Sequence, residues 1–298
     1  MTTPYQQAPQ PGPPTPQGAP PQHGHGPDLF GYTSPIPARR AHLGDAVASE
    51  WTKIRSVRST MWTLGTMVAL MVGVGLLTAA AIGATSGNVG SANVLVLGFF
   101  GVLLGTMCVI TLGVLVIASE YGTGMIRTTL TACPGRGRVL GAKSLVFFVL
   151  VFVVSTVTTL VVGALQVALL DGRSPGGYEW FRSTVGISLY LALLGLLSLA
   201  VGTMIRHSAG AITIMIGVVL LPLVMAMFMF SESLDGVREA LFTYSIPAQL
   251  AVFYGSDVSF DPASSVGGSQ SWQPLWIMLG LTVVAMAGAY LSLDRRDA

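Results

Sequence analysis

Charged residues are scarce in this chain of 298 residues. Asp, Glu, Lys and Arg together make up 9% of it, whereas a soluble domain carries about 25%. No charged side chain occurs between Arg58 and Glu120. The net charge of +2 is too small to indicate a nucleic-acid partner. With 52% hydrophobic residues, the composition predicts an integral membrane protein instead of a soluble one.

Cysteine is also rare, and the two cysteines are not predicted to form a disulfide. Cys108 lies in a hydrophobic run and Cys133 in the polar segment after it, so the two thiols are expected at different depths. The four histidines form no metal-ligand pattern, because three of them lie in or near the N-terminal region. The sequence therefore predicts no metal site.

The chain lacks a nucleotide-binding motif and a catalytic group. The stretch "GRGRVLGAKS" resembles a phosphate loop, but that motif requires lysine directly after its second glycine, and here Ala142 precedes Lys143. We interpret Lys143 as a charge that flanks a membrane span. Ser188 and His207, the one pair that suggests a hydrolase, lie about 28 Å apart along a helix. We therefore predict neither enzyme activity nor a cofactor bound by this chain.

Proline is concentrated at the N-terminus, where residues 1–40 hold 11 of the 17 prolines. Such a composition cannot bury enough apolar surface to offset the entropy of ordering. Residues 1–42 are therefore predicted to form a disordered cytoplasmic tail, and residues 43–298 the membrane domain. A polyproline ligand in "PQPGPPTP" is the alternative reading of the tail.

Six apolar segments are long enough to cross about 30 Å of hydrocarbon as helices of roughly 20 residues. They are residues 61–83, 94–118, 144–170, 184–205, 209–230 and 275–293. The fold class expected is thus an all-α integral membrane protein with six transmembrane helices. Acidic residues are absent from all six segments, which disfavours a carrier that moves protons through an intramembrane carboxylate.

Lysine and arginine are unevenly distributed among the connecting segments. With the N-terminus inside, twelve of the fifteen lie on the cytoplasmic side, and Arg173, Arg182 and Arg238 lie outside. Because positive residues are retained in the cytoplasm, this bias predicts that both termini are cytoplasmic.

An amphipathic helix is predicted just before the first span. Residues 45–61 place apolar side chains at helical spacing, with Glu50 on another face, which is typical of a helix lying on the inner membrane surface. A lipid anchor with no further role is the alternative. The candidate interfacial residues of this amphipathic helix are Trp51, Lys53, Arg55 and Arg58.

Two more short helices are expected between the fifth and sixth spans. Residues 234–245 and 246–255 are apolar stretches of about ten residues, too short to span, and indicate re-entrant or interfacial outer helices. Pro247 fits the first turn of the second.

Polarity within the spans is mild. The hydroxyls of "STVTT" at 155–159, together with Gln166, could line a path or could bond to the backbone of their own helix. Gly101 and Gly105 form a GxxxG pair that permits close helix contact.

The longest cytoplasmic break, residues 119–142, contains most of the inner polarity. Residues 123–133 predict a short helix that has Thr123 as its N-cap and ends at Pro134. Gly122 and Gly124 allow a sharp change of direction before it. We expect a helix that leaves the membrane, a bend, and a surface helix that another protein could push.

The inner motifs resemble those of a known family. "SEWTKIRSVRSTMW", a span, and then "ASEYGTGMIRTTLTACPGRGRVLGAKSL" are similar to the ABC-2 type permeases of ABC transporters, especially actinobacterial ones. Members read Ser-Glu-Tyr and then Gly-Thr-Ile-Arg-Thr-Thr-Leu, whereas here Gly124 and Met125 interrupt the second run. The resemblance covers about residues 45–295.

This resemblance implies a permease subunit in a bacterial cell membrane that works as a dimer with a copy or paralogue. Residues 45–61 would be its connecting helix and 123–133 its coupling helix, both docked on a separate ATPase subunit that binds ATP and Mg. Export of a drug, antibiotic, lipid or polysaccharide is implied. The expected coupling residues are Glu120, Gly124, Arg127, Thr128, Arg136 and Arg138. The alternatives are a membrane scaffold or sensor that transports nothing, and a secondary carrier.

Overall fold

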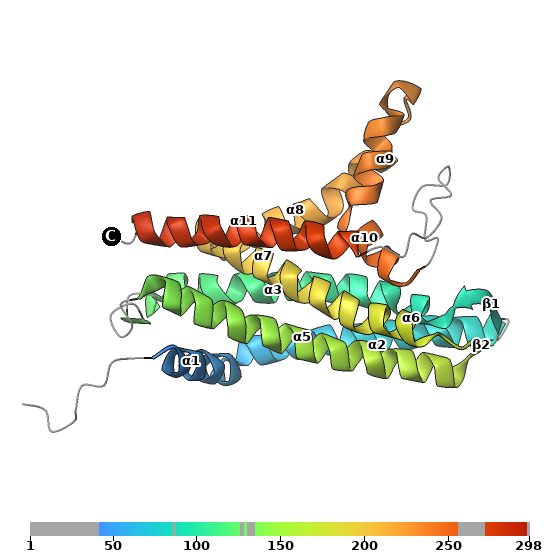
Figure 1. Cartoon of the computed structure of the whole chain (residues 1–298), viewed down its shortest axis with the longest axis horizontal. Helices are drawn as coiled ribbons and strands as arrows, with labels where there is room; N and C mark the ends of the chain where they lie inside the picture. The colour runs from blue at the N-terminus through green and yellow to red at the C-terminus, as the bar shows by residue number, and fades with distance from the viewer. Residues whose placement is uncertain (1–41, 86–87, 126–127, 130–134, 256–271, 297–298) are drawn as a thin grey trace, which may run out of the picture. The chain divides into compact units, whose positions relative to one another are not determined.

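The computed structural model describes residues 42–85, 88–125, 128–129, 135–255 and 272–296 (Figure 1). Within these residues, six helices are long and apolar enough to cross a membrane. They are α2 (Arg58–Thr85), α3 (Phe99–Thr123), α5 (Arg136–Leu169), α7 (Ile187–Ile205), α8 (Ser208–Met227) and α11 (Gln273–Arg296). The predicted helical architecture with six apolar helices is confirmed. The predicted tail lies outside the described residues, apart from His42.

Several helices run past the ends that hydropathy predicts. α3 continues to Thr123 instead of ending at residue 118, and α5 begins at Arg136 instead of residue 144. These extensions place Glu120 and Lys143 inside helices that qualify as spans. The predicted uncharged segments are therefore the apolar middles of longer helices, because hydropathy does not mark the last turns of a helix, and both charges lie in those added turns.

α7 lies at the centre of the packing. It contacts α3, α5, α8 and α11, and its side chains Tyr190, Leu191 and Leu194 are fully buried. A Cβ added at Gly113 of α3 would lie 2.5 Å from the carbonyl oxygen of Gly195 in α7, so the two backbones touch directly.

The contact between α2 and α3 also requires glycine. A Cβ at Gly101 would lie 2.7 Å from the carbonyl oxygen of Met71. The close helix approach that the GxxxG pair predicts is thus present at its first glycine. At Gly105, an added Cβ would be 3.0 Å from the Met71 side chain.

The hydroxyls of the third span bond to their own helix. Ser155 donates to the carbonyl of Val151, and Thr159 donates to that of Ser155. The backbone-bonded reading of "STVTT" is therefore correct. Gln166 behaves differently, because its buried side chain donates across to the Gly75 carbonyl of α2 at 2.9 Å.

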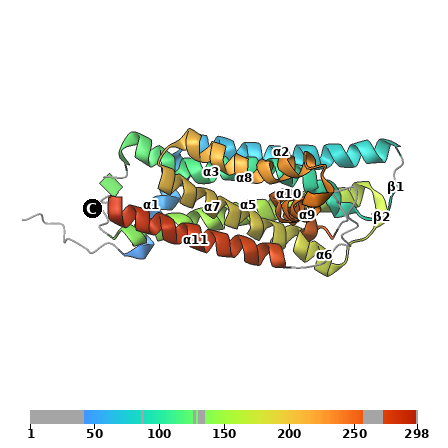
Figure 2. The same cartoon turned by 90° about the horizontal axis from the view of Figure 1, so that it is seen from above.

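The N-terminal amphipathic helix is shorter than predicted. α1 (Leu43–Ser56) ends at Val57, whose extended backbone (ψ 112°) separates it from α2, so the single helix over 45–61 is wrong. α1 packs against α5. Both views place α1 and the C-terminal end of α11 at one end of the helices (Figure 1, Figure 2).

Short elements occupy the opposite end. β1 (Asn88–Asn93) and β2 (Asp171–Arg173) pair in parallel, which the sequence did not predict. The 3₁₀-helix η1 (Val94–Gly98) leads into α3, and α6 (Gly177–Phe181) with the π-helical turn η2 (Arg182–Gly186) leads into α7.

Two short helices lie between α8 and α11, as predicted. After the 3₁₀-turn η3 (Glu232–Leu234) come α9 (Asp235–Tyr244) and α10 (Ile246–Phe253), with Pro247 in the first turn of α10. α9 is mostly exposed, whereas α10 is mostly buried and contacts α3, α7 and α11.

α10 is fastened to the rest of the fold by buried polar bonds. The Tyr190 hydroxyl of α7 donates to Gln249 Oε1 at 2.8 Å. Arg182 is 1% exposed and donates to the Val252 carbonyl at 2.6 Å. The sequence places Arg182 in an outer loop. It is buried instead, and its positive charge lies at the C-terminal end of α10, where the helix dipole stabilises a cation.

Candidate functional site

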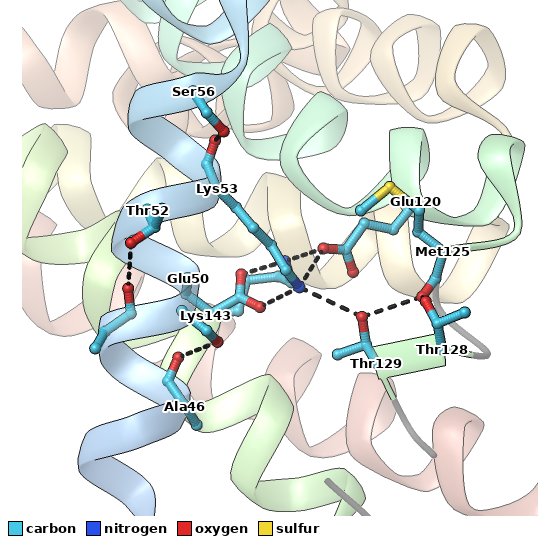
Figure 3. A network of polar contacts seen from close by, with 12 residues as sticks. Ala46, Glu50, Thr52, Lys53, Ser56, Glu120, Met125, Thr128, Thr129 and Lys143 are labelled. Carbon is cyan, nitrogen blue, oxygen red and sulfur yellow. Dashed lines mark hydrogen bonds and ion pairs between the residues drawn. The ribbon is translucent and has the colours of Figure 1, made fainter. Parts of the chain in front are cut away.

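Four charged side chains meet where α1, α3 and α5 end or begin. We call Glu50, Lys53, Glu120 and Lys143 the four-charge cluster (Figure 3). Glu50 and Lys53 come from α1, Glu120 from the last turn of α3, and Lys143 from the third turn of α5. Residues 93 positions apart in the chain are thereby joined through a single hydrogen bond, from Lys143 to Glu50.

Each lysine of the cluster bridges both glutamates. Lys143 Nζ lies 2.6 Å from Glu50 Oε2 and 2.9 Å from Glu120 Oε1. Lys53 Nζ lies 2.7 Å from Glu50 Oε1 and 3.1 Å from the same Glu120 Oε1. The two positive and two negative charges balance, so the cluster as a whole has no net charge. This pairing offsets the large cost of removing buried ions from water.

Burial differs among the four charges. The side chains of Lys143, Glu50 and Glu120 are 2%, 3% and 7% exposed, whereas that of Lys53 is 28% exposed. Burial raises the pKa of Glu50, but Lys143 and then Lys53 outweigh it, so the Glu50 pKa lies below its ordinary value. Burial lowers the pKa of Lys53, and the two carboxylates outweigh that effect and raise it.

The segment after α3 is tied to this cluster. Gly124 ends α3 in the left-handed conformation (φ 72°), which provides the predicted change of direction. Beyond it, the hydroxyls of Thr128 and Thr129 both donate to the Met125 carbonyl. Lys53 Nζ also donates to Thr129 Oγ1 at 3.3 Å. Thus a described part of the predicted coupling helix contacts α1 directly.

Two cavities border the cluster. One, of about 270 Å³, lies among α1, the first turn of α2 and the last turns of α3, and we call it the α1–α3 cavity. The other, of about 280 Å³, lies among α1, the start of α5 and the segment after Gly124. Glu50, Lys53 and Met125 line both.

The structure brings together some of the predicted site residues and leaves others apart. Glu120 and Lys53, predicted for separate roles, share one ion pair. Lys53 therefore points into the protein and not toward lipid. Thr123 is not the predicted N-cap, since it lies in α3 and donates to the Ser119 carbonyl. Trp51, Arg55, Arg58, Thr128 and Arg138 are exposed.

Two further predicted residues have no described side chain. Arg127 lies outside the described residues, and so does the side chain of Arg136, the first residue of α5. The coupling roles expected of Arg127 and Arg136 stay predictions. The described partners of Glu120 are the two lysines.

Sequence reasoning missed Glu50 and Lys143, although the pattern contains a signal for each. The placement of Glu50 on another face than the apolar side chains is wrong: it lies three residues after Val47 and four before Ile54, so it shares their helix face, and it is buried with Ile54. Lys143 lies four residues after the buried Val139 and four before the buried Phe147. Both charges interrupt an otherwise apolar face, which favours a buried ion pair over a flanking charge.

No protein-family model matches this chain, and no curated protein matches it. The ABC-2 permease resemblance therefore rests on the inner motifs of the sequence and stays a prediction.

Proposed function

We propose that the chain is the membrane-spanning permease subunit of an ATP-driven exporter, and that the four-charge cluster transmits movement from an ATPase subunit into the membrane helices. The supporting observation is the contact of Lys53 with Thr129, Glu50 and Glu120 at once. Lys53 thereby links the segment after Gly124 to both α1 and α3.

The physical argument concerns the cost of breaking this link. Removing one partner from a buried ion pair costs about 3–5 kcal/mol, whereas a surface pair contributes about 0–1 kcal/mol. Displacement of the segment after Gly124 therefore moves α1, α3 and α5 together more easily than it separates them. A hinge on one side and a stiff ionic joint on the other is what a coupling element needs.

The buried charges also bear on the two alternatives. A secondary carrier is disfavoured because the six predicted apolar segments contain no carboxylate, and Glu120 lies in the last turn of α3, beyond the second of them. Glu120 nevertheless pairs with two lysines at the end of α3, and not with a group midway along a span. A scaffold or sensor without transport would have no use for a joint that connects a hinged surface segment to three helices.

The test is co-purification of the full chain with an ATPase from its native membrane, followed by ATP hydrolysis in proteoliposomes. We expect Thr129→Val to preserve the complex and to lower transport-coupled hydrolysis, because the variant keeps the shape of Thr129 and loses its hydroxyl. Thr213→Val is the matched control, because Thr213 is an exposed threonine on α8 whose hydroxyl donates to the Ala209 carbonyl of its own helix. Absence of any ATPase in the complex would refute the proposal.

A further inference from the structure

A small cavity lies beside η1 and η2, the short elements that lead into α3 and α7. We call it the Tyr254 cavity, because Tyr254, just after α10, forms part of its wall. All the residues that line it are buried. The space open to the centre of a water molecule is about 20 Å³, and one water needs about 10–15 Å³. The cavity therefore has room for one water molecule and not for a larger ligand.

Tyr254 brings an unused hydroxyl group to this cavity. The residue is 4% exposed, and its hydroxyl makes no hydrogen bond to a residue that the structure describes. A buried hydroxyl without a partner destabilises a fold. The Tyr254 oxygen is not among the unpartnered buried atoms that have lost nearly all their accessible surface. A water molecule in the cavity can therefore touch it.

Hydrogen-bond acceptors line the same cavity. Thr159 contributes to its wall from α5, and Ser183 from η2. Thr159 donates its hydroxyl proton to the Ser155 carbonyl, and Ser183 donates to the Glu179 carbonyl. Both hydroxyl oxygens thus keep lone pairs that can accept a hydrogen bond. A buried water typically makes about three hydrogen bonds, and a cavity stays dry only when its walls are apolar.

We propose that the Tyr254 cavity binds one structural water molecule, which accepts the proton of the Tyr254 hydroxyl and donates to the hydroxyl oxygens of Thr159 and Ser183. The water connects the segment after α10 to α5 and η2. It adds a second polar fastening beside the bond from Arg182 to the Val252 carbonyl. This site does not depend on the proposed transport function.

Hydroxyl-radical labelling with pulsed X-rays tests the proposal on the purified full chain, with mass spectrometry as the readout. The pulse produces radicals from bound water in place, and these oxidise the adjacent side chains. Met71 and Tyr254 line the cavity, whereas the similarly buried Met278 and Tyr190 do not. Met71 and Tyr254 should be oxidised several-fold faster than Met278 and Tyr190. Equal rates for the two sets overturn the proposal.

A cavity-filling variant locates the water. Gly98 lines the cavity, and a Cβ added there would lie 3.3 Å from Tyr254 Oη. Gly98→Ala should therefore displace the water and lower the oxidation of Met71 to that of Met278. Gly83→Ala is the matched control, because its Cβ would make an ordinary contact outside this cavity. Unchanged oxidation of Met71 in Gly98→Ala overturns the assignment.

Thermal unfolding of Tyr254→Phe provides a test that does not change the volume of the wall by a methyl group. Loss of the hydrogen bond to the water should lower Tm by about 2–4 °C. Tyr244→Phe is the control, because Tyr244 is exposed and its variant should leave Tm unchanged. If the cavity is dry, removal of an unpartnered hydroxyl leaves Tm of Tyr254→Phe unchanged or raises it, and either result overturns the proposal. Neither experiment needs an ATPase, so the water site and the transport function can fail independently.

Discussion

Replacement of Lys143 by methionine tests whether the four-charge cluster is a stiff joint. Lys143 is 2% exposed and pairs with two carboxylates that are 3% and 7% exposed. The variant keeps the apolar stem and leaves two buried negative charges with a single lysine. We expect a loss of about 3–5 kcal/mol in the free energy of unfolding, as for other broken buried pairs.

A second substitution should restore part of this loss. Glu50→Gln in the same chain removes the excess negative charge and leaves the pair of Lys53 and Glu120, 3.1 Å apart. Because the two sites are in contact, the double variant should cost about 0.5–3 kcal/mol less than the sum of the single variants. The pair of Arg173 and Glu179 is the control. Its side chains are 55% and 22% exposed, so Arg173→Met should cost about 0–1 kcal/mol.

The assay is reversible unfolding of the purified chain in mixed micelles with increasing denaturing detergent, followed by tryptophan fluorescence at pH 7. The reasoning is refuted if Lys143→Met and Arg173→Met cost the same, or if the effects at Glu50 and Lys143 simply add. Either outcome would mean that water and detergent already solvate the cluster.

Three further predictions concern pH, backbone and topology. Burial raises the pKa of Glu50, but the two lysines outweigh burial and hold the pKa below its ordinary value. The stability that Glu50 confers is therefore present at pH values above the ordinary pKa and is lost as the pH falls through the folded pKa, so Glu50→Gln should flatten this acid limb of the unfolding profile. Gly124→Ala should cost about 1–2 kcal/mol in unfolding free energy, because its φ of 72° strains any L residue, whereas Gly122→Ala within α3 should cost nothing. In a cysteine-free background, a cysteine at Gly236 should react with an impermeant maleimide in intact cells and one at Ser208 should not; the opposite result would reverse the predicted orientation.

Features that depend on local composition could be predicted from the sequence. The six apolar helices follow from runs without charge, the start of α10 follows from Pro247, and the bend after α3 follows from Gly124. In each case the physical cause lies within a few residues of the effect. Hydropathy, helix capping and backbone freedom are therefore sufficient.

Features that depend on partners far away in the sequence could not be predicted from it. Lys143 reads as a flanking charge because its partners lie 93 and 23 residues away. Arg182 reads as a loop residue because the carbonyl that accepts its hydrogen bond lies 70 residues further along. Only the folded chain shows that these charges are compensated, and hence that burial is tolerated.

The seam between α3 and α7 has a mechanical consequence. At Gly113 and Gly195 the two helices touch backbone to backbone, with no side chain between them. A small shift of α3 there cannot be absorbed by a change of rotamer, since no rotamer exists at the contact. α7 must follow.

That constraint extends to the opposite end of the molecule. Tyr190 of α7 donates a hydrogen bond to Gln249 of α10. Arg182, just before α7, donates one to the Val252 carbonyl of α10. A rotation that starts at Glu120 would therefore be delivered, through α7, to a buried helix at the far end of the bundle. Movement would thus be transmitted by one rigid helix, α7, and not by a series of separate side-chain rearrangements.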